Sequence, residues 1–256
     1  MQARIVSAGR GVRWLAEGWR LFRAAPFGWL AAVFGYWLVM SLVSVVPIIG
    51  PAAAAILVPA FSVGFMALAR AAGHRSPLEL RLLFDGFRHE LRPQIALGVL
   101  YLACLIVMLG ASSLADEGAL AHWLLTGQRP GEDVLQSAGF LGALLATATL
   151  YMPVMLAFWF APPLAAWHST GALKALFFSF AASMMNWRAF LGYGAVTALV
   201  TLVIPFLALA ALALFAEGGQ LPAAGFVLPI MILLLPTLFA SFYVSYRDVF
   251  GYDAAP

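Results

Sequence analysis

Residues 27–69 read FGWLAAVFGYWLVMSLVSVV, PIIG and PAAAAILVPAFSVGFMALA, which are two apolar runs joined by a short turn containing Pro47, Gly50 and Pro51. Neither run contains a charged residue, and each has close to the ~20 residues that a helix needs to cross ~30 Å of hydrocarbon. The first run is longer than the roughly 7–15 apolar residues of a secretory signal. This stretch therefore predicts a transmembrane helical hairpin.

The composition extends that interpretation to the whole chain. Of its 256 residues, 64% are apolar or aromatic and 10% are charged, whereas a soluble domain carries about 25% charged residues. So few charges cannot cover a water-facing surface. We expect an all-α integral membrane protein that forms a single polytopic domain over residues 1–256 and has six transmembrane helices. The expected spans are 27–46, 50–69, 94–114, 138–161, 189–215 and 224–245.

The basic residues fall almost entirely on one side of this arrangement. Thirteen of the 14 Lys and Arg residues lie before, between or after the hairpins, and Arg129 lies in a turn on the other side. Short loops rich in Lys and Arg stay in the cytoplasm. We therefore expect a bacterial inner-membrane protein with both termini in the cytoplasm and residues 116–137 outside. The thirteen are Arg4, Arg10, Arg13, Arg20, Arg23, Arg70, Arg75, Arg81, Arg88, Arg92, Lys174, Arg188 and Arg247.

The even-numbered spans align on a proline. Pro59, Pro153 and Pro236 are each followed six residues later by an aromatic residue. The odd-numbered spans each follow a short amphipathic stretch that is typical of a helix lying in the membrane interface. These features predict a threefold repeat of interfacial helix and hairpin, although prolines are common in membrane helices generally. The amphipathic stretches are 14–25, 78–91 and 172–185, and the repeat units are approximately 14–73, 78–168 and 172–250.

Three short stretches carry a resemblance to known families. Gly18–Phe22, followed by Pro26 and Trp29, resembles uncharacterised proteobacterial inner-membrane families. Phe160–Pro163 and Ala172–Ser179 resemble a pattern of Ala-Pro-x-Leu, Ala-Leu-x-x-Ser and Asn. That pattern is shared by YciC-like proteins and the membrane domain attached to some glycerophosphodiester phosphodiesterases. The resemblance implies a six-helix inner-membrane protein and brings no established activity or catalytic residue with it.

The expected spans contain no Asp, Glu, Lys, Arg or His in their interiors, whereas proton relays and ion paths are usually built from such residues. The four histidines form no metal-binding pair, and the single cysteine, Cys104, excludes an intramolecular disulfide. No phosphate-binding loop or hydrolase motif is present. We therefore expect no catalytic residue, no cofactor and no metal, and we interpret the acidic residues of 116–137 as a solvated loop.

The basic face predicts contact with membrane lipids. An Arg beside an anionic leaflet gains about 1 kcal/mol, and the charge belongs to the flanks of spans rather than to a separate basic domain. We therefore expect anionic headgroups as partners and no nucleic acid. The residues expected at headgroups are Arg20, Arg23, Arg81, Arg88 and Arg92.

Three functions remain open. The first is a non-enzymatic role in organising, assembling or maintaining the cell envelope. The second is a carrier or channel for an apolar or zwitterionic small solute or a lipid, with a path lined by hydroxyl groups and by helices kinked at Pro59, Pro153 and Pro236. The third, a lipid-modifying enzyme, needs a polar cluster at the cytoplasmic interface. The residues available for such a cluster are Arg70, His168, Asn186, Arg188, Arg247 and Asp248.

Overall fold

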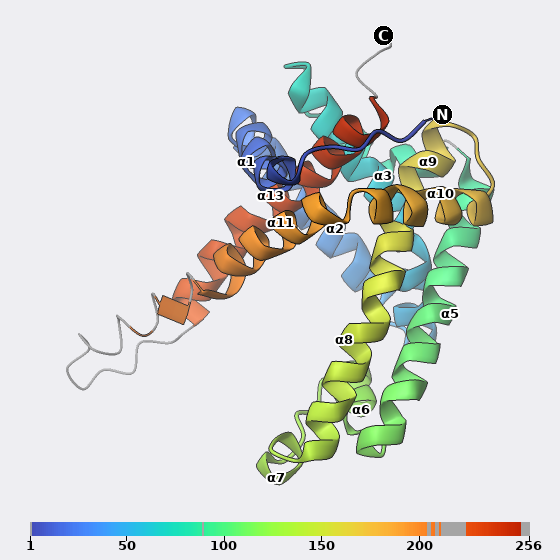
Figure 1. The fold of residues 1–256 in the computed structure, drawn as a ribbon, viewed down its shortest axis with the longest axis vertical. Coiled ribbons are helices and arrows are strands. Elements are labelled where there is room, and N and C mark those ends of the chain that lie inside the picture. Colours follow the sequence, from blue (N-terminus) through green and yellow to red (C-terminus); the bar gives the residue numbers. More distant parts are fainter. Residues whose placement is uncertain (1, 89, 204–205, 208–209, 211–223, 252–256) are drawn as a thin grey trace. The chain divides into compact units, whose positions relative to one another are not determined.

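A computed structural model describes residues 2–88, 90–203, 206–207, 210 and 224–251 (Figure 1). Every regular element in these residues is a helix, so the all-α prediction is confirmed for them. The elements are α1 (Ala8–Ala24), α2 (Pro26–Val43), α3 (Ile49–Gly73), the 3₁₀ turn η1 (Leu80–Phe84), α4 (Asp85–Arg88), α5 (Leu91–Asp116), α6 (Ala119–Thr126), α7 (Glu132–Leu135), α8 (Ala138–Trp159), α9 (Ala161–Trp167), α10 (Ala172–Met185), α11 (Trp187–Ala198), the π-helical turn η2 (Leu199–Val203) and α13 (Ala224–Phe250).

Four helical segments of the described residues are long and apolar enough to cross a membrane. They are Pro26–Val43, Ile49–Gly73, Leu91–Asp116 and Ala138–Trp167, and they correspond to the first four expected spans. The fifth expected span, 189–215, begins as α11 and η2, and much of the rest lies outside the described residues. The sixth, 224–245, lies within α13.

The chain divides into two compact units. One comprises residues 1–42, 60–89 and 182–256, and the other comprises residues 43–59 and 90–181. We call them the α1 unit and the α5 unit. The expectation of a single domain built from three repeat units stays a prediction.

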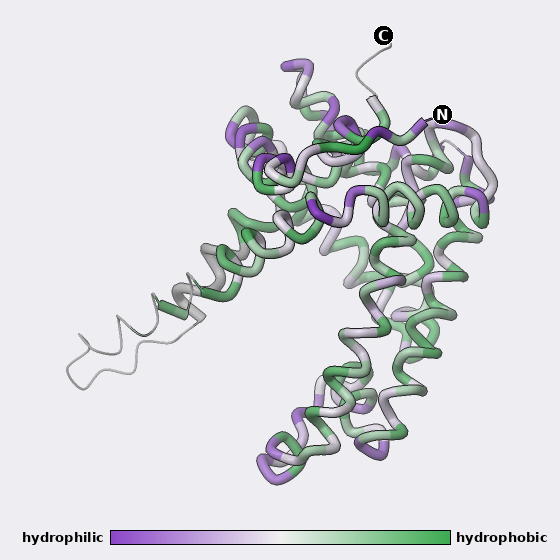
Figure 2. Tube along the Cα trace, in the orientation of Figure 1, coloured by the Kyte–Doolittle hydropathy of each residue, from purple (hydrophilic) through white to green (hydrophobic). Residues whose placement is uncertain are grey.

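In the α5 unit, α5 and α8 pack along each other with most of their apolar surface uncovered. In the most apolar 18-residue stretch of each segment, 22% of the residues are buried in α5 and 11% in Ala138–Trp167. Figure 2 shows both helices hydrophobic along most of their length, with hydrophilic residues near the α6–α7 connection. An apolar surface of this extent is a liability in water, and in a bilayer it is the surface that meets lipid.

The connection between α5 and α8 differs from the expected solvated loop. It contains α6 and α7, and Leu120 of α6 is buried against Phe140 and Ala143 of α8. The apolar stretch over 119–125 is interrupted by His122 and is too short for its pattern to distinguish a helix from a loop. The helix forms because it can cover the end of α8.

The break between α8 and α9 is closed by a serine of α10. Ser179 is fully buried, and its hydroxyl accepts a hydrogen bond from the Phe160 N–H at 2.9 Å and donates one to the Leu156 carbonyl at 3.0 Å. The buried Gln94 of α5 donates through Nε2 to the Pro162 carbonyl at 2.9 Å. The two Ser179 bonds satisfy backbone groups that the bend leaves without helical partners, and the Gln94 bond fixes α9 to α5.

In the α1 unit, α1 lies against α11 and α13 (Figure 1). Its close approach depends on two glycines spaced two helical turns apart. A Cβ at Gly11 would overlap the carbonyl oxygen of Ala189, and one at Gly18 would lie 2.5 Å from that of Thr237. Side chains at these positions would hold the helices apart.

The amphipathic stretches differ in part from the expected interfacial helices. The first helix begins at Ala8 rather than Trp14, and α11 and α13 cover the side that contains Trp14 and Phe22. The second stretch forms a 3₁₀ turn and a single α-helical turn rather than a continuous helix. This stretch packs closely against α3, because Gly64 has no side chain. A Cβ at that position would lie 2.0 Å from the Leu83 carbonyl oxygen. The third forms α10 with the expected bounds.

Gly18→Ala should destabilise the protein because the new methyl group meets the backbone of α13. Overpacking of this kind typically costs about 1–3 kcal/mol, so we expect a lower unfolding midpoint in detergent micelles. Gly9→Ala is the matched control, since a Cβ there meets nothing within 4 Å. Replacing a helical glycine by alanine in open space should stabilise by up to about 1 kcal/mol. Equal shifts of the same sign in both variants would contradict the packing described for α1.

Candidate functional site

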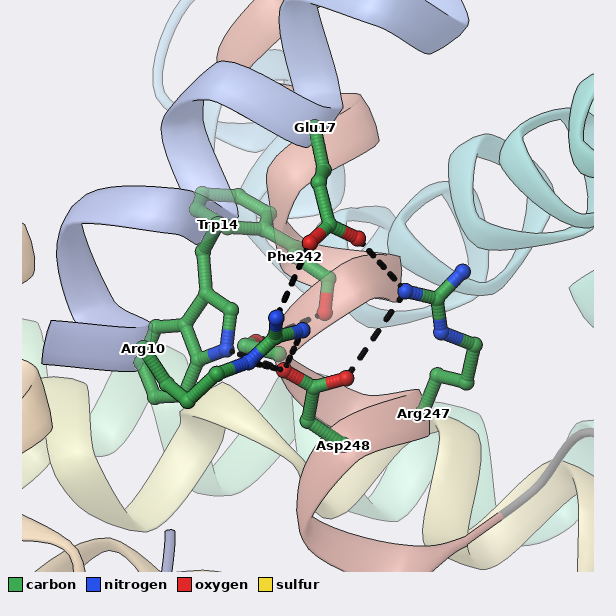
Figure 3. A network of polar contacts seen from close by, with 7 residues as sticks. Arg10, Trp14, Glu17, Phe242, Arg247 and Asp248 are labelled. Carbon is green, nitrogen blue, oxygen red and sulfur yellow. Dashed lines mark hydrogen bonds and ion pairs between the residues drawn. The ribbon is translucent and has the colours of Figure 1, made fainter. Parts of the chain in front are cut away.

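A closed ring of alternating charges joins the start of α1 to the end of α13 (Figure 3). Its four members are Arg10 and Glu17 of α1 and Arg247 and Asp248 of α13, and we call them the charge ring. On α1 the two charged residues are seven positions apart, and on α13 they are adjacent. Seven positions are two helical turns, so Arg10 and Glu17 share one side of α1, and Arg247 reaches Glu17 from α13 through its terminal Nη2.

The contacts run continuously around the ring. Arg10 binds Asp248 through Nε at 2.7 Å and also through Nη2, and its Nη1 lies 3.1 Å from Glu17 Oε1. Arg247 Nη2 donates to Glu17 Oε2 at 2.6 Å and lies 3.7 Å from Asp248 Oδ1. The indole of Trp14 donates to Asp248 Oδ2 at 2.9 Å. Asp248 thus receives bonds from two residues of α1.

The ring is neutral overall and partly shielded from solvent. Its side chains retain 12–25% of their exposure, so the charges interact more strongly than surface pairs do. Burial opposes the charge on Arg10, but Asp248 and Glu17 outweigh burial and raise the pKa of Arg10 above its ordinary value. Arg10 therefore stays cationic, and the two carboxylates of the ring are engaged by arginines.

Trp14 occupies the junction of three helices. Its ring is fully buried and meets Phe190 edge-on at 5.4 Å and Tyr193 at 6.0 Å, both from α11. The Tyr193 hydroxyl in turn lies 2.7 Å from the Ser241 hydroxyl of α13. Trp14 therefore connects the apolar core of the α1 unit to its charge ring.

The extended segment before α1 is held by Asn186, which is 2% exposed. The amide oxygen of Asn186 accepts from the Val6 N–H at 2.8 Å, and its nitrogen donates to the carbonyls of Arg4 at 3.1 Å and Ala182 at 2.9 Å. The Arg4 N–H donates to the Val249 carbonyl at 2.7 Å. We call residues 4–7 the N-terminal strap.

Two concave surfaces adjoin these contacts in the α1 unit. A polar pocket of about 430 Å³ lies between the strap and the charge ring. An apolar groove, also of about 430 Å³, lies between α1, α11–η2 and α13. The groove is lined by Val12, Leu15, Ala16, Trp19, Val196, Val200, Leu233, Leu234 and Thr237.

The cluster expected from the sequence is brought together only in part. Arg247 and Asp248 lie together in the charge ring, whereas Asn186 is bonded to the strap. Arg188 lies on α11 with its guanidinium 5.4 Å from the ring centre of Trp187. Arg70 stands in the last turn of α3. His168 follows α9 and belongs to the α5 unit.

The residues expected at headgroups are all exposed, and their contact with headgroups stays a prediction. Arg20 and Arg23 lie on α1, Arg88 on α4 and Arg92 in the first turn of α5. Arg81 is bound to Glu79. The three expected kink positions, Pro59, Pro153 and Pro236, lie inside α3, α8 and α13. Their role in a solute path stays a prediction.

Sequence reasoning did not select Arg10 and Glu17 as site residues. The signal was present, because Arg10, Trp14 and Glu17 share one side of a helix at spacings of four and three. The expected helix began at Trp14 and therefore left Arg10 outside it. Glycines at positions 9 and 11 weaken the helical pattern there, and the close approach to Ala189 of α11 is what favours Gly11.

No group of three or more His, Cys, Asp or Glu residues in the described part of the chain is placed to hold a metal ion. The polar residues of the family-like pattern have clear bonding partners instead. Ser179 closes the break after α8, and Asn186 holds the strap. Both side chains thus bond to backbone groups at bends of the chain.

The chain is 38% identical over 257 aligned positions to a protein of Burkholderia thailandensis described as a probable inner membrane protein. The alignment covers 98% of this chain and 94% of that relative. The chain matches no family profile, so its resemblance to YciC-like proteins and to the phosphodiesterase-associated membrane domain stays a prediction. No solved structure matches it.

Asn186→Leu should release the N-terminal strap, because Val6 and Arg4 then lose their side-chain partner in a partly buried site. Leaving such groups unsatisfied costs about 1–3 kcal/mol, and hydrogen exchange at the Val6 amide should accelerate. Asn186→Asp is the control, since it keeps the acceptor for Val6 and removes both donated bonds. Slow exchange at Val6 in the leucine variant would contradict the role given to Asn186.

Proposed function

Because this chain belongs to the same family of inner-membrane proteins as the Burkholderia thailandensis relative, we propose that it is a non-enzymatic, six-span protein that helps to organise or maintain the cell envelope. The termini and the charge ring lie on the cytoplasmic side in this proposal. The observation that carries it is the neutral charge ring, in which the ionisable groups bind one another.

The proposed topology rests on charge and on helix order. The one-sided distribution of Lys and Arg favours cytoplasmic termini. Four helical segments have the length and composition of spans. In the proposed topology those segments form two hairpins, and the order of α11, η2 and α13 favours a third hairpin.

The absence of catalysis is supported by what the ring does with its charges. A catalytic acid, base or nucleophile needs access to substrate and a pKa suited to its task. Glu17 and Asp248 each accept bonds from arginines, and Asp248 also accepts from Trp14. These bonds tie α1 to α13, which is the arrangement expected of a positioning device.

The carrier alternative has less support. Several hydroxyls expected to line a path bond to carbonyls of their own helices instead, as Thr237 does to Leu233, Ser241 to Leu238 and Thr149 to Leu145. Such bonds are typical of helix packing in membranes. The carrier function stays a second candidate.

The Burkholderia thailandensis relative offers a functional test. We expect its deletion to sensitise cells to detergent and to a chelator, and this chain to restore resistance. The variant Glu17→Gln with Arg247→Gln removes one positive and one negative charge and keeps both side chains polar. Complementation by it should follow the amount of protein found in the membrane, because the role is structural.

Loss of complementation at an unchanged amount of folded protein would contradict this function, since it would mean that the charges themselves are used on a substrate. Arg129→Gln with Glu132→Gln is the matched control. That pair is exposed and joined at 2.8 Å in the α5 unit, outside the charge ring.

A further inference from the structure

We propose that the apolar groove of the α1 unit, together with Arg23, is a binding site for one anionic phospholipid of the cytoplasmic leaflet. An acyl chain occupies the groove and the lipid phosphate binds the guanidinium. The inference rests on the proposed function in one respect, the placement of α1 at that leaflet.

The shape and chemistry of the groove suit an acyl chain. Its volume of about 430 Å³ falls within the ~300–1,000 Å³ typical of small-molecule sites. The lining is apolar apart from the Trp19 indole N–H and the Thr237 hydroxyl, and that hydroxyl donates to the Leu233 carbonyl at 2.9 Å. The Thr237 hydroxyl in the lining is thus already bonded, and the groove favours a hydrocarbon chain over a polar ligand.

One side of α1 leads from this groove to a cation. Val12, Ala16 and Trp19 line the groove at helical spacing, and Arg23 continues the same stripe one turn later. The Arg23 guanidinium lies 5.7 Å from the ring centre of Trp19. An amphiphile whose chain lies in the groove therefore has a cation beside its polar end.

The charges of α1 favour an anionic headgroup. Glu17 is the single acid in α1, and it is bound to Arg10 and Arg247 in the charge ring. Arg13 and Arg20 flank the groove stripe and are exposed. Arginine binds phosphate oxygens through paired N–H donors, so a phosphate at Arg23 meets positive charge without a competing carboxylate from α1.

These observations distinguish Arg23 from Arg81 and Arg88, two of the other arginines expected at headgroups. Arg81 is neutralised by Glu79, and none of the residues that line the apolar groove is adjacent to Arg88 in the chain. We assign anchoring to those residues and a defined lipid site to Arg23. Trp19 supports the assignment, because tryptophan rings favour the depth at which chain and headgroup meet.

The test measures lipid retention by the purified full-length protein. Native mass spectrometry compares phosphatidylglycerol with phosphatidylcholine carrying the same acyl chains. We expect preferential retention of phosphatidylglycerol, and Arg23→Gln should weaken it by about fivefold, the equivalent of about 1 kcal/mol. Arg23→Lys should restore part of the loss. Arg188→Gln is the matched control, because Arg188 also lies over a tryptophan ring, but its tryptophan, Trp187, does not line the groove as Trp19 does.

A second variant tests the groove separately. Ala16→Phe fills it from an exposed position on α1 and should reduce retention of both lipids. Val12→Trp serves the same purpose if the first variant lowers the unfolding midpoint. Equal losses in Arg23→Gln and Arg188→Gln, unchanged retention with a filled groove, or a dimer that covers the groove would each overturn the proposal. Envelope complementation is measured independently, so failure of the lipid site and failure of the proposed function can be told apart.

Discussion

Hydrocarbon offers no hydrogen bonds, and the side-chain bonds at the breaks between helices follow from that constraint. A backbone group that leaves a helix within or beside a bilayer must find a partner in the protein. Ser179 supplies both partners at the break after α8, and Asn186 bonds to Ala182 at the bend before α11 and to Val6 and Arg4 of the N-terminal strap. The same requirement applies to charge, and the four members of the charge ring satisfy one another.

Glycine decides where such bonds can form. α1 reaches α11 and α13 because Gly11 and Gly18 leave room for backbone carbonyls. Once the helices are that close, Trp14 fills the space between them and its N–H reaches Asp248. The two glycines, Trp14 and the charge ring thus together hold α1 against α11 and α13. Beside this contact, the apolar groove lies between α1, α11–η2 and α13.

The sequence was sufficient for the features that depend on periodicity and composition. The bounds of α2, α3, α5 and α8 follow from long apolar runs, and α10 was expected with its observed bounds. The sequence was not sufficient for features whose position depends on tertiary contacts. The start of α1 at Ala8, the broken helix after residue 79 and the helix at 119–126 each depend on a neighbour that the local pattern does not reveal. For the same reason Arg247 and Asp248 were selected without their partners on α1.

The central claim is a six-span chain with its basic loops and charge ring in the cytoplasm, and cysteine labelling tests it directly. The single native cysteine allows a Cys104→Ser background. Single cysteines are then placed at Ser76, Thr126, Ser169 and Glu217, and intact cells are treated with a maleimide that does not cross the inner membrane. The account predicts labelling at positions 126 and 217 and protection at 76 and 169. Protection at position 217 together with labelling at 126 would contradict it, because the chain would then cross the membrane four times.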